Sequence, residues 1–331
     1  MQLSLFLCFI VGIFVGGISS FSDTSKDIAF RIGQPLIEAL FIWAVNGFLI
    51  ISGWFGLRLK FQSILKLWIC LVCIYVPFQL ADLIFQRFSL SDFIDNIIAF
   101  TRENYFTQCY LMLLFLSPII NLFINKYGRK ILLYVSFLFT IEIVAYLIDN
   151  QSLGVNNGYS LFHFVLMYML ARCASLYKKE VERIPRKTTF IVFLLCTFCI
   201  FILHIVGGND EKVYGISNPI IILQAFCLFF TFRSLKISQS KIINTVASHT
   251  FAVYIMHTCG LLCAAIIKAD TWMLMNLNYF IYLPLYVLMC VIVFVACVVY
   301  DLVREKITDP FSTRLMTSYN KHLKPKFNIY L

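Results

Sequence analysis

Two histidines of this chain stand where an imidazole could do chemistry in apolar surroundings. His163 lies in "GYSLFHFVLMYMLAR" and His257 lies in "SHTFAVYIMHT", and both stretches are mainly apolar. An ionisable side chain at membrane depth is costly unless it faces an internal cavity or a partner. Either residue is therefore a candidate for an internal functional cavity, and the alternative for each is a structural hydrogen bond.

Further polar and small residues gather in one apolar run. Glu38 precedes Asn46 by about two helical turns on nearly the same face, and Ser52 and Gly53 follow in "VNGFLIISGWFG". Polar groups within hydrocarbon are costly unless they face a cavity or a partner. The small residues allow close approach of either a ligand or a neighbouring helix. For Glu38 the alternative to an internal site is a position at the level of the lipid headgroups, where the side chain reaches water.

Tyr105 begins another apolar run, in "ENYFTQCY", where it fits either an internal site or an aromatic belt at the membrane surface. Glu142 lies inside a further run, so its carboxylate needs a partner that the sequence alone does not identify. The twelve cysteines fall mostly in apolar stretches, and two pairs with C-x-x-C spacing have no histidine nearby. We therefore expect the cysteines to pack as apolar residues and expect no metal site.

The composition predicts the environment of these residues. Of the 331 residues, 60% are hydrophobic and only 13% are charged, and the mean hydropathy is +0.84. A soluble protein has about 25% charged residues, so the chain is predicted to be an integral protein of a lipid bilayer. The formal net charge of +10 does not indicate nucleic-acid binding, because Lys and Arg form short clusters between the apolar runs. Such clusters are typical of loops at an anionic membrane surface.

Ten apolar segments have the length of a membrane crossing, which is about 20 residues for a hydrocarbon core of about 30 Å. Backbone polar groups must be satisfied within lipid, so each segment is predicted to be a helix of an all-α integral membrane bundle. The segments are 1–18, 35–55, 64–84, 104–125, 130–148, 158–177, 188–206, 217–235, 246–267 and 279–303. A secretory signal peptide is the alternative for 1–18, but no positively charged region precedes its apolar part.

Most of the 27 Lys and Arg residues fall in loops on one side of such a bundle or in the C-terminal segment. Under the positive-inside rule this asymmetry places both termini in the cytoplasm. We therefore divide the chain into a transmembrane domain, 1–305, and a basic cytoplasmic tail, 306–331. These features alone fit a transporter as well as a transmembrane enzyme.

Five stretches of the chain carry a more specific signal. They are "AVNGFLIISGWFGLRLKF", "YFTQCYLMLLFLSPIINLFIN", "NNGYSLFHFVLMYMLAR", "NPIIILQAFCLFFTFRSLKI" and "INTVASHTFAVYIMHT". In this order and spacing they resemble the acyltransferase 3 family, the membrane-bound O-acyltransferases of bacterial surface polysaccharides. The resemblance implies transfer of an acetyl group from acetyl-CoA to a hydroxyl of a cell-surface or lipid-linked polysaccharide. It also implies the bacterial cytoplasmic (inner) membrane and the O-acetyltransferases found in capsule and O-antigen gene sets.

The resemblance further implies roles for the residues named above. The catalytic residues would be His257 and His163. The substrate site would be lined by Glu38, Asn46, Ser52, Gly53, Tyr105 and Tyr254. Two cations at the cytoplasmic mouth, Arg58 and Arg172, would hold the phosphates of CoA, and the alternative for both is the ordinary positive-inside distribution of charge.

The first helix of that family carries an Arg and a His that is taken to be catalytic. The corresponding segment here, "MQLSLFLCFIVGIFVGG", holds neither, and Val11 falls near the position of the His. Two explanations account for the missing Arg and His. Either the protein starts upstream of Met1 and its first helix has diverged, or it has lost the standard chemistry of the family. The alternatives to an active acyltransferase are an inactive family member that binds a glycan or a partner, and a transporter or flippase of a lipid-linked sugar.

Overall fold

The computed structural model describes residues 28–85, 91, 105–148, 156–207, 210–235 and 240–322. Within these ranges the secondary structure is helical and no strand occurs, which confirms the predicted all-α class. The first predicted segment, 1–18 with Val11, lies outside the described residues. Every other predicted segment coincides with one or more helices.

The longer helices are apolar runs, and several begin at a residue whose side chain caps the first turn. Ser160, Asn218 and Ser240 each accept a hydrogen bond from a backbone N–H two or three residues later. The longer helices are α2 (Ile28–Phe41), α3 (Ala44–Phe55), α4 (Phe61–Ile84), α6 (Tyr105–Tyr127), α7 (Ile131–Leu147), α8 (Leu161–Leu176), α10 (Arg186–Ile205), α12 (Pro219–Arg233), α13 (Lys241–Ser248), α14 (Thr250–His257), α15 (Gly260–Asn276) and α16 (Tyr279–His322). Short helical turns connect some of them, namely η1 (Gly128–Lys130), η3 (Asn156–Gly158), α9 (Lys178–Val181) and α11 (Asp210–Val213).

Five helical stretches among the described residues are long and apolar enough to cross a membrane, or six if α14 and α15 count as one bent span. Two helices that coincide with predicted crossings are shorter, because α8 has 16 residues and α12 has 15. A helix of that length extends about 24 Å, which is less than the hydrocarbon core of about 30 Å. The chain is therefore a membrane protein with several apolar helices, while ten crossings stay a prediction.

The predicted single helix 246–267 is wrong in one respect, because α14 and α15 meet at a bend of 72°. Cys259 between them has extended backbone angles, with φ −81° and ψ 133°, so the helical hydrogen bonds cannot continue through it. Gly260 then packs directly on α4, where a Cβ atom would collide with the carboxylate of Asp82. A tertiary contact thus fixes the bend, which apolar periodicity does not reveal.

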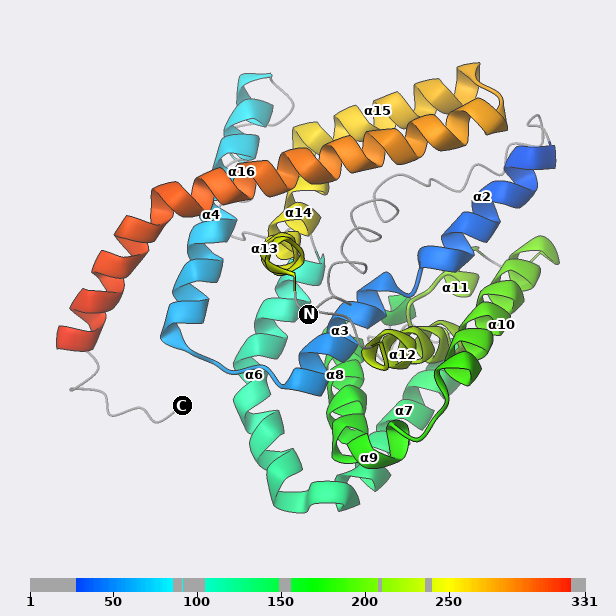
Figure 1. Ribbon diagram of the computed structural model, residues 1–331, viewed down its shortest axis with the longest axis horizontal. Coiled ribbons are helices and arrows are strands. Elements are labelled where there is room, and N and C mark those ends of the chain that lie inside the picture. Colours follow the sequence, from blue (N-terminus) through cyan, green and yellow to red (C-terminus); the bar gives the residue numbers. More distant parts are fainter. Residues whose placement is uncertain are drawn as a thin grey trace.

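The helices form two groups that are visible in Figure 1. In the first, which we call the α8 bundle, α3, α6 and α7 pack on α8, while α12 packs on α3 and α10, and α10 packs on α2. In the second, the α16 bundle, α14, α15 and α16 pack on one another and on α4. The largest buried side chains of the α8 bundle include Trp43, Phe164 and Tyr168. The boundary between the two bundles is the place where a ligand could be enclosed.

The helix α16 has 44 residues and continues without a break past residue 305, where the predicted cytoplasmic tail begins. Its second half runs beside α4 (Figure 1), and Tyr319 stacks on Phe61 with ring centroids 4.0 Å apart. The first part of the predicted tail is therefore a packed helix that extends the α16 bundle.

Candidate functional site

A cavity of about 520 Å³ lies between the two bundles. The α8 bundle lines it with α3 and α6, and the α16 bundle lines it with α4, α13, α14 and α16. We call two sets of its lining residues the aromatic part, Phe48, Phe106, Tyr110 and Phe251, and the charged part, Arg58, Lys66, Asp301, Arg304, Glu305 and Asp309. A cavity of this size with apolar walls and a few convergent polar groups is typical of a small-molecule site.

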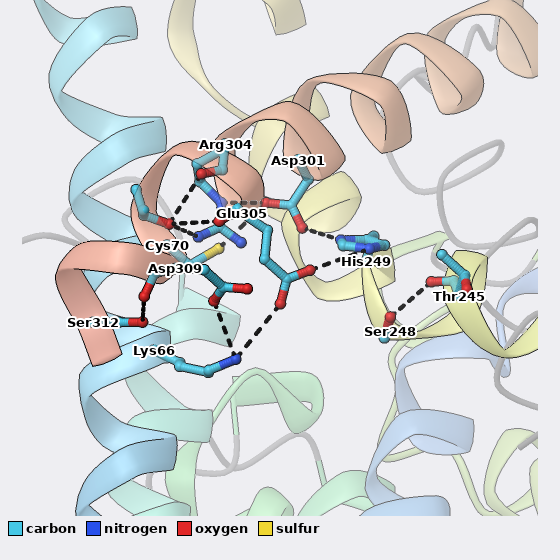
Figure 2. Close-up of polar contacts among 11 residues, drawn as sticks. Lys66, Cys70, Thr245, Ser248, His249, Asp301, Arg304, Glu305, Asp309 and Ser312 are labelled. Atoms are coloured by element: carbon cyan, nitrogen blue, oxygen red, sulfur yellow. Dashed lines mark hydrogen bonds and ion pairs between the residues drawn. The ribbon is translucent and has the colours of Figure 1, made fainter. Parts of the chain in front are cut away.

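The carboxylates of the charged part come from one face of α16. Asp301, Glu305 and Asp309 follow one another at intervals of four residues, so they project from the same side of the helix. Lys66 Nζ on α4 lies 3.7 Å from Glu305 Oε1 and 3.5 Å from Asp309 Oδ1 (Figure 2). These partly exposed ion pairs add little stability. Their main consequence is that Lys66 has two anionic partners on α16.

His249 precedes the first residue of α14 and is joined to α16 by a short polar contact. Its Nδ1 lies 2.6 Å from Oδ2 of Asp301, and Arg304 Nε donates to Oδ1 of the same carboxylate at 2.5 Å (Figure 2). Nε2 of His249 lies 3.6 Å from Oε2 of Glu305, which is too far for a direct hydrogen bond. His249 and Asp301 are only 4% and 2% exposed. Asp301 therefore holds the imidazole in a fixed orientation at the edge of the cavity.

Arg58 and Ser52, both predicted site residues, do line the cavity. Arg58 forms no ion pair with any described residue, so its guanidinium group is available to an anionic ligand. Ser52 Oγ lies 3.2 Å from the hydroxyl of Tyr110, whose ring stacks on Phe106 at 5.7 Å. The aromatic part thus contains two hydroxyl groups among apolar ring faces.

Gly53 and Arg172, which were also predicted to be site residues, do not line the cavity. Gly53 faces α8, where a Cβ atom would meet the backbone oxygen of Tyr168 and the Cβ atom of Ala171. Arg172 lies against Gly56, and its Nη1 is 3.3 Å from the hydroxyl of Ser175. Gly53 therefore serves the close packing of α3 on α8, which was the alternative stated for it.

Asn46 and His163 meet in a buried set of hydrogen bonds together with Glu142, whose partner the sequence left open. His163 Nδ1 lies 2.6 Å from Glu142 Oε1, and Nε2 lies 2.8 Å from Asn46 Oδ1. Asn46 Nδ2 donates to the carbonyl oxygen of Ile216 at 2.8 Å, so its Oδ1 is the acceptor and His163 Nε2 carries a proton. All three side chains are fully buried. Both ring nitrogens of His163 are therefore occupied by structural partners.

His257 lies near the cavity but not on its wall. Its Nδ1 donates to the backbone oxygen of Val253 at 2.9 Å, so the lone pair is on Nε2, which has no hydrogen-bond partner among the described residues. Ring contacts lead from the cavity to His257, because Phe106 packs on Tyr254 at 4.6 Å and Tyr254 packs on His257 at 5.5 Å. His257 is 1% exposed. It is a buried imidazole with one free acceptor site.

The two remaining predicted residues, Tyr105 and Glu38, lie away from the charged part. The ring of Tyr105 meets Tyr159 edge to face at 4.9 Å, and its hydroxyl is hydrogen-bonded to Tyr254. Glu38 on α2 is near enough to Tyr159 to interact with it electrostatically. The structure therefore brings Glu38, Tyr105, Tyr254 and His257 into one neighbourhood, and Tyr254 connects it to the cavity through its contact with Phe106.

A protein-family model described as an acyltransferase domain matches residues 4–302. The chain belongs to the acyltransferase 3 family. No curated protein and no solved structure matches it. The family match includes His249 and Asp301 and ends before Arg304, Glu305 and Asp309. Within the described ranges, no three His, Cys, Asp or Glu side chains are placed to hold a metal ion together.

Apart from Arg58, the charged part of this cavity was not predicted from the sequence. His249, Asp301, Arg304 and Glu305 were not among the predicted site residues. A signal was present in "YDLVREKITD", because acidic residues four apart follow directly on an apolar run and so mark a polar face. The pairing of Asp301 with His249 was not detectable, since 52 residues separate them.

Proposed function

We propose that this acyltransferase 3 protein is an O-acetyltransferase of the bacterial inner membrane. It would move an acetyl group from acetyl-CoA to a hydroxyl of a cell-surface or lipid-linked polysaccharide, such as a capsule or O-antigen. The observation that supports this most is the cavity, in which Arg58, which forms no ion pair with a described residue, and further cations lie near an aromatic pocket. Acetyl-CoA matches both features, because its phosphates are anionic and its acyl group is small and apolar.

The donor fits the charged part through its phosphates and the aromatic part through its acyl end. Arg58 supplies a guanidinium group that has no ion-pair partner within the described ranges, and such a group can bind two phosphate oxygens at once. Lys66 adds a positive charge that pairs with Glu305 and Asp309. We propose that the phosphates of CoA compete with these carboxylates when the donor binds.

Binding of this donor fits the orientation in the membrane that the charges of the loops predict, with ten crossings and both termini in the cytoplasm. The charged part contains Arg58 and Lys66, which border a connection that the positive-inside rule assigns to the cytoplasm. Acetyl-CoA would then enter from the cytoplasmic side, and the polysaccharide would approach from the opposite side.

We propose that the acceptor sugar contacts Glu38, Tyr105, Tyr254 and His257. A sugar presents several hydroxyl groups, and the free Nε2 of His257 can accept a hydrogen bond from one of them. His163 is a less suitable base than the sequence suggests, because both of its nitrogens are occupied. We propose that it holds α3, and with it the cavity wall, in place.

Arg58→Gln is expected to weaken acetyl-CoA binding about tenfold, which corresponds to about 1.4 kcal/mol. The variant loses a charged donor to phosphate but leaves every described ion pair intact. Binding is measured by calorimetry on the purified protein in lipid nanodiscs. Arg183→Gln is the matched control, because Arg183 is exposed and does not line the cavity. Equal affinities of wild type and Arg58→Gln would contradict the assignment of Arg58 to the donor site.

His257→Gln is expected to raise the KM for the polysaccharide up to about tenfold, because one neutral hydrogen bond contributes about 1 kcal/mol. The affinity for acetyl-CoA should stay unchanged, since His257 does not line the cavity. The measurement is the rate of acetyl transfer as a function of polysaccharide concentration, with His204→Gln on α10 as control. A changed affinity for acetyl-CoA together with an unchanged KM for the polysaccharide would overturn this role.

A transporter or flippase of a lipid-linked sugar is the rival function. It is tested by enclosing the polysaccharide precursor in proteoliposomes and measuring both its movement and the consumption of acetyl-CoA. The proposed enzyme consumes acetyl-CoA and leaves the distribution of unmodified precursor unchanged. Movement of the precursor without consumption of acetyl-CoA would support the transporter instead.

A further inference from the structure

Among the described residues that line the cavity, one side chain is of a type that exchanges a proton near neutral pH. The lining Lys, Arg, Cys and Tyr side chains are of types whose ordinary pKa values lie above 7. The lining carboxylates are weak bases, and each faces a cation or His249. Neither His163 nor His257 is among the lining residues. This leaves His249, a residue to which neither the sequence analysis nor the family match gave a role.

The contacts of His249 prepare it to accept a proton. Asp301 accepts the hydrogen of Nδ1 at 2.6 Å, which fixes the tautomer and leaves the lone pair on Nε2. A buried carboxylate in this position also stabilises the imidazolium ion that forms when Nε2 gains a proton. Arg304 holds the same carboxylate through its other oxygen at 2.5 Å. The orientation of the imidazole is thus set by partners on α16 and not by rotation of a free side chain.

We infer that His249 and Asp301 are the acid–base pair of acetyl transfer, with His249 as the catalytic residue and Asp301 as its positioning residue. This assignment rests on the function proposed above. Nε2 of His249 takes the proton of the acceptor hydroxyl, and the oxygen of that hydroxyl forms a bond to the carbonyl carbon of the thioester. The tetrahedral intermediate then loses its C–S bond, and the thiolate of CoA takes the same proton from Nε2. One ester and one CoA thiol result, and the imidazole returns to its neutral form.

Charged groups surround His249 on the cavity wall. Asp301, Glu305 and Arg304 face it from α16, and Lys66 and Cys70 line the same cavity from α4. A general base acts in its unprotonated form, so the transfer rate of the wild type should rise with pH over the acidic range. Removal of the imidazole should abolish this rise.

The test uses the full-length protein in proteoliposomes with radiolabelled acetyl-CoA and a chemically de-O-acetylated capsular polysaccharide as acceptor probe. His249→Asn keeps a side-chain N–H near Asp301 and removes the basic nitrogen. It should lower kcat by about 10²- to 10⁴-fold, while acetyl-CoA binding stays within about threefold of wild type. Asp301→Asn should lower kcat less and shift the pH profile, because the imidazole remains but its orientation and charge partner are changed. His249→Ala should regain activity when imidazole is added, which a merely misfolded variant would not do.

The outcomes separate this inference from the proposed function. Acetyl transfer by the wild type together with a kcat of His249→Asn within about threefold of wild type would overturn the role of His249 and leave the proposed function standing. Failure of the wild type both to bind acetyl-CoA and to consume it would contradict the proposed function, and the inference would fall with it. A large loss of kcat in His249→Asn with unchanged donor binding supports both.

Discussion

Replacing His163 by Leu is expected to destabilise the protein by about 3–5 kcal/mol, since it removes one partner of a buried charge-bearing pair. Glu142 would be left fully buried without its hydrogen bond of 2.6 Å, and Asn46 would lose the bond of 2.8 Å. The three residues join α7, α8 and α3, so the damage should spread to the cavity wall. Thermal and denaturant-induced unfolding of the purified protein in detergent micelles measures the loss.

The double variant His163→Leu/Glu142→Leu is the control for this prediction. It removes both members of the pair, so no carboxylate is left buried without a partner, and it should recover part of the lost stability. A double variant that is less stable than His163→Leu would show that the two residues do not act as a pair. Glu142→Gln, which keeps one hydrogen bond, should fall between wild type and His163→Leu.

Gly53→Ala is expected to destabilise the protein, although the same change in an exposed helix interior stabilises by about 0.5–1 kcal/mol. The added Cβ atom would meet the backbone oxygen of Tyr168, which cannot move without shifting α8. Overpacking of this kind costs about 1–3 kcal/mol. The sign of the change in unfolding free energy therefore reports on the contact between α3 and α8.

Ser52→Ala is the matched control, because Ser52 is the preceding residue of α3 and lines the cavity. It loses only the contact of 3.2 Å with Tyr110, so its effect on stability should be no more than about 1 kcal/mol. An increase in stability for Gly53→Ala would contradict the close packing of α3 on α8.

The helices were predictable because the length of a membrane crossing is fixed by the bilayer and not by tertiary contacts. The segments 64–84 and 188–206 lie within α4 and α10 apart from one residue at the end of the latter. The bend at Cys259 was not predictable, since the residues on both sides of it are apolar and helix-forming. What fixes it is the approach of Gly260 to Asp82, a contact between distant parts of the chain.

The candidate site was predictable only in part, because it also depends on contacts between distant parts of the chain. A buried polar residue such as Asn46 or Glu142 indicates that a partner exists, but the sequence does not say whether the partner is a ligand or another side chain. The structure gives Asn46 and Glu142 a common partner in His163 and leaves Ser52 and Arg58 on the cavity. The acidic face of α16 was overlooked because charged residues after an apolar run are also typical of a cytoplasmic tail.

Our central proposal is that acetyl-CoA binds in this cavity and that its acetyl group is transferred to a glycan. The most direct measurement is the transfer of radiolabelled acetyl from acetyl-CoA to de-O-acetylated capsular polysaccharide by the full-length protein in proteoliposomes, with Arg58→Gln in parallel. Labelled polysaccharide is expected with the wild type, and a higher KM for acetyl-CoA is expected with Arg58→Gln. Absence of label from the polysaccharide, together with no detectable binding of acetyl-CoA, would contradict it.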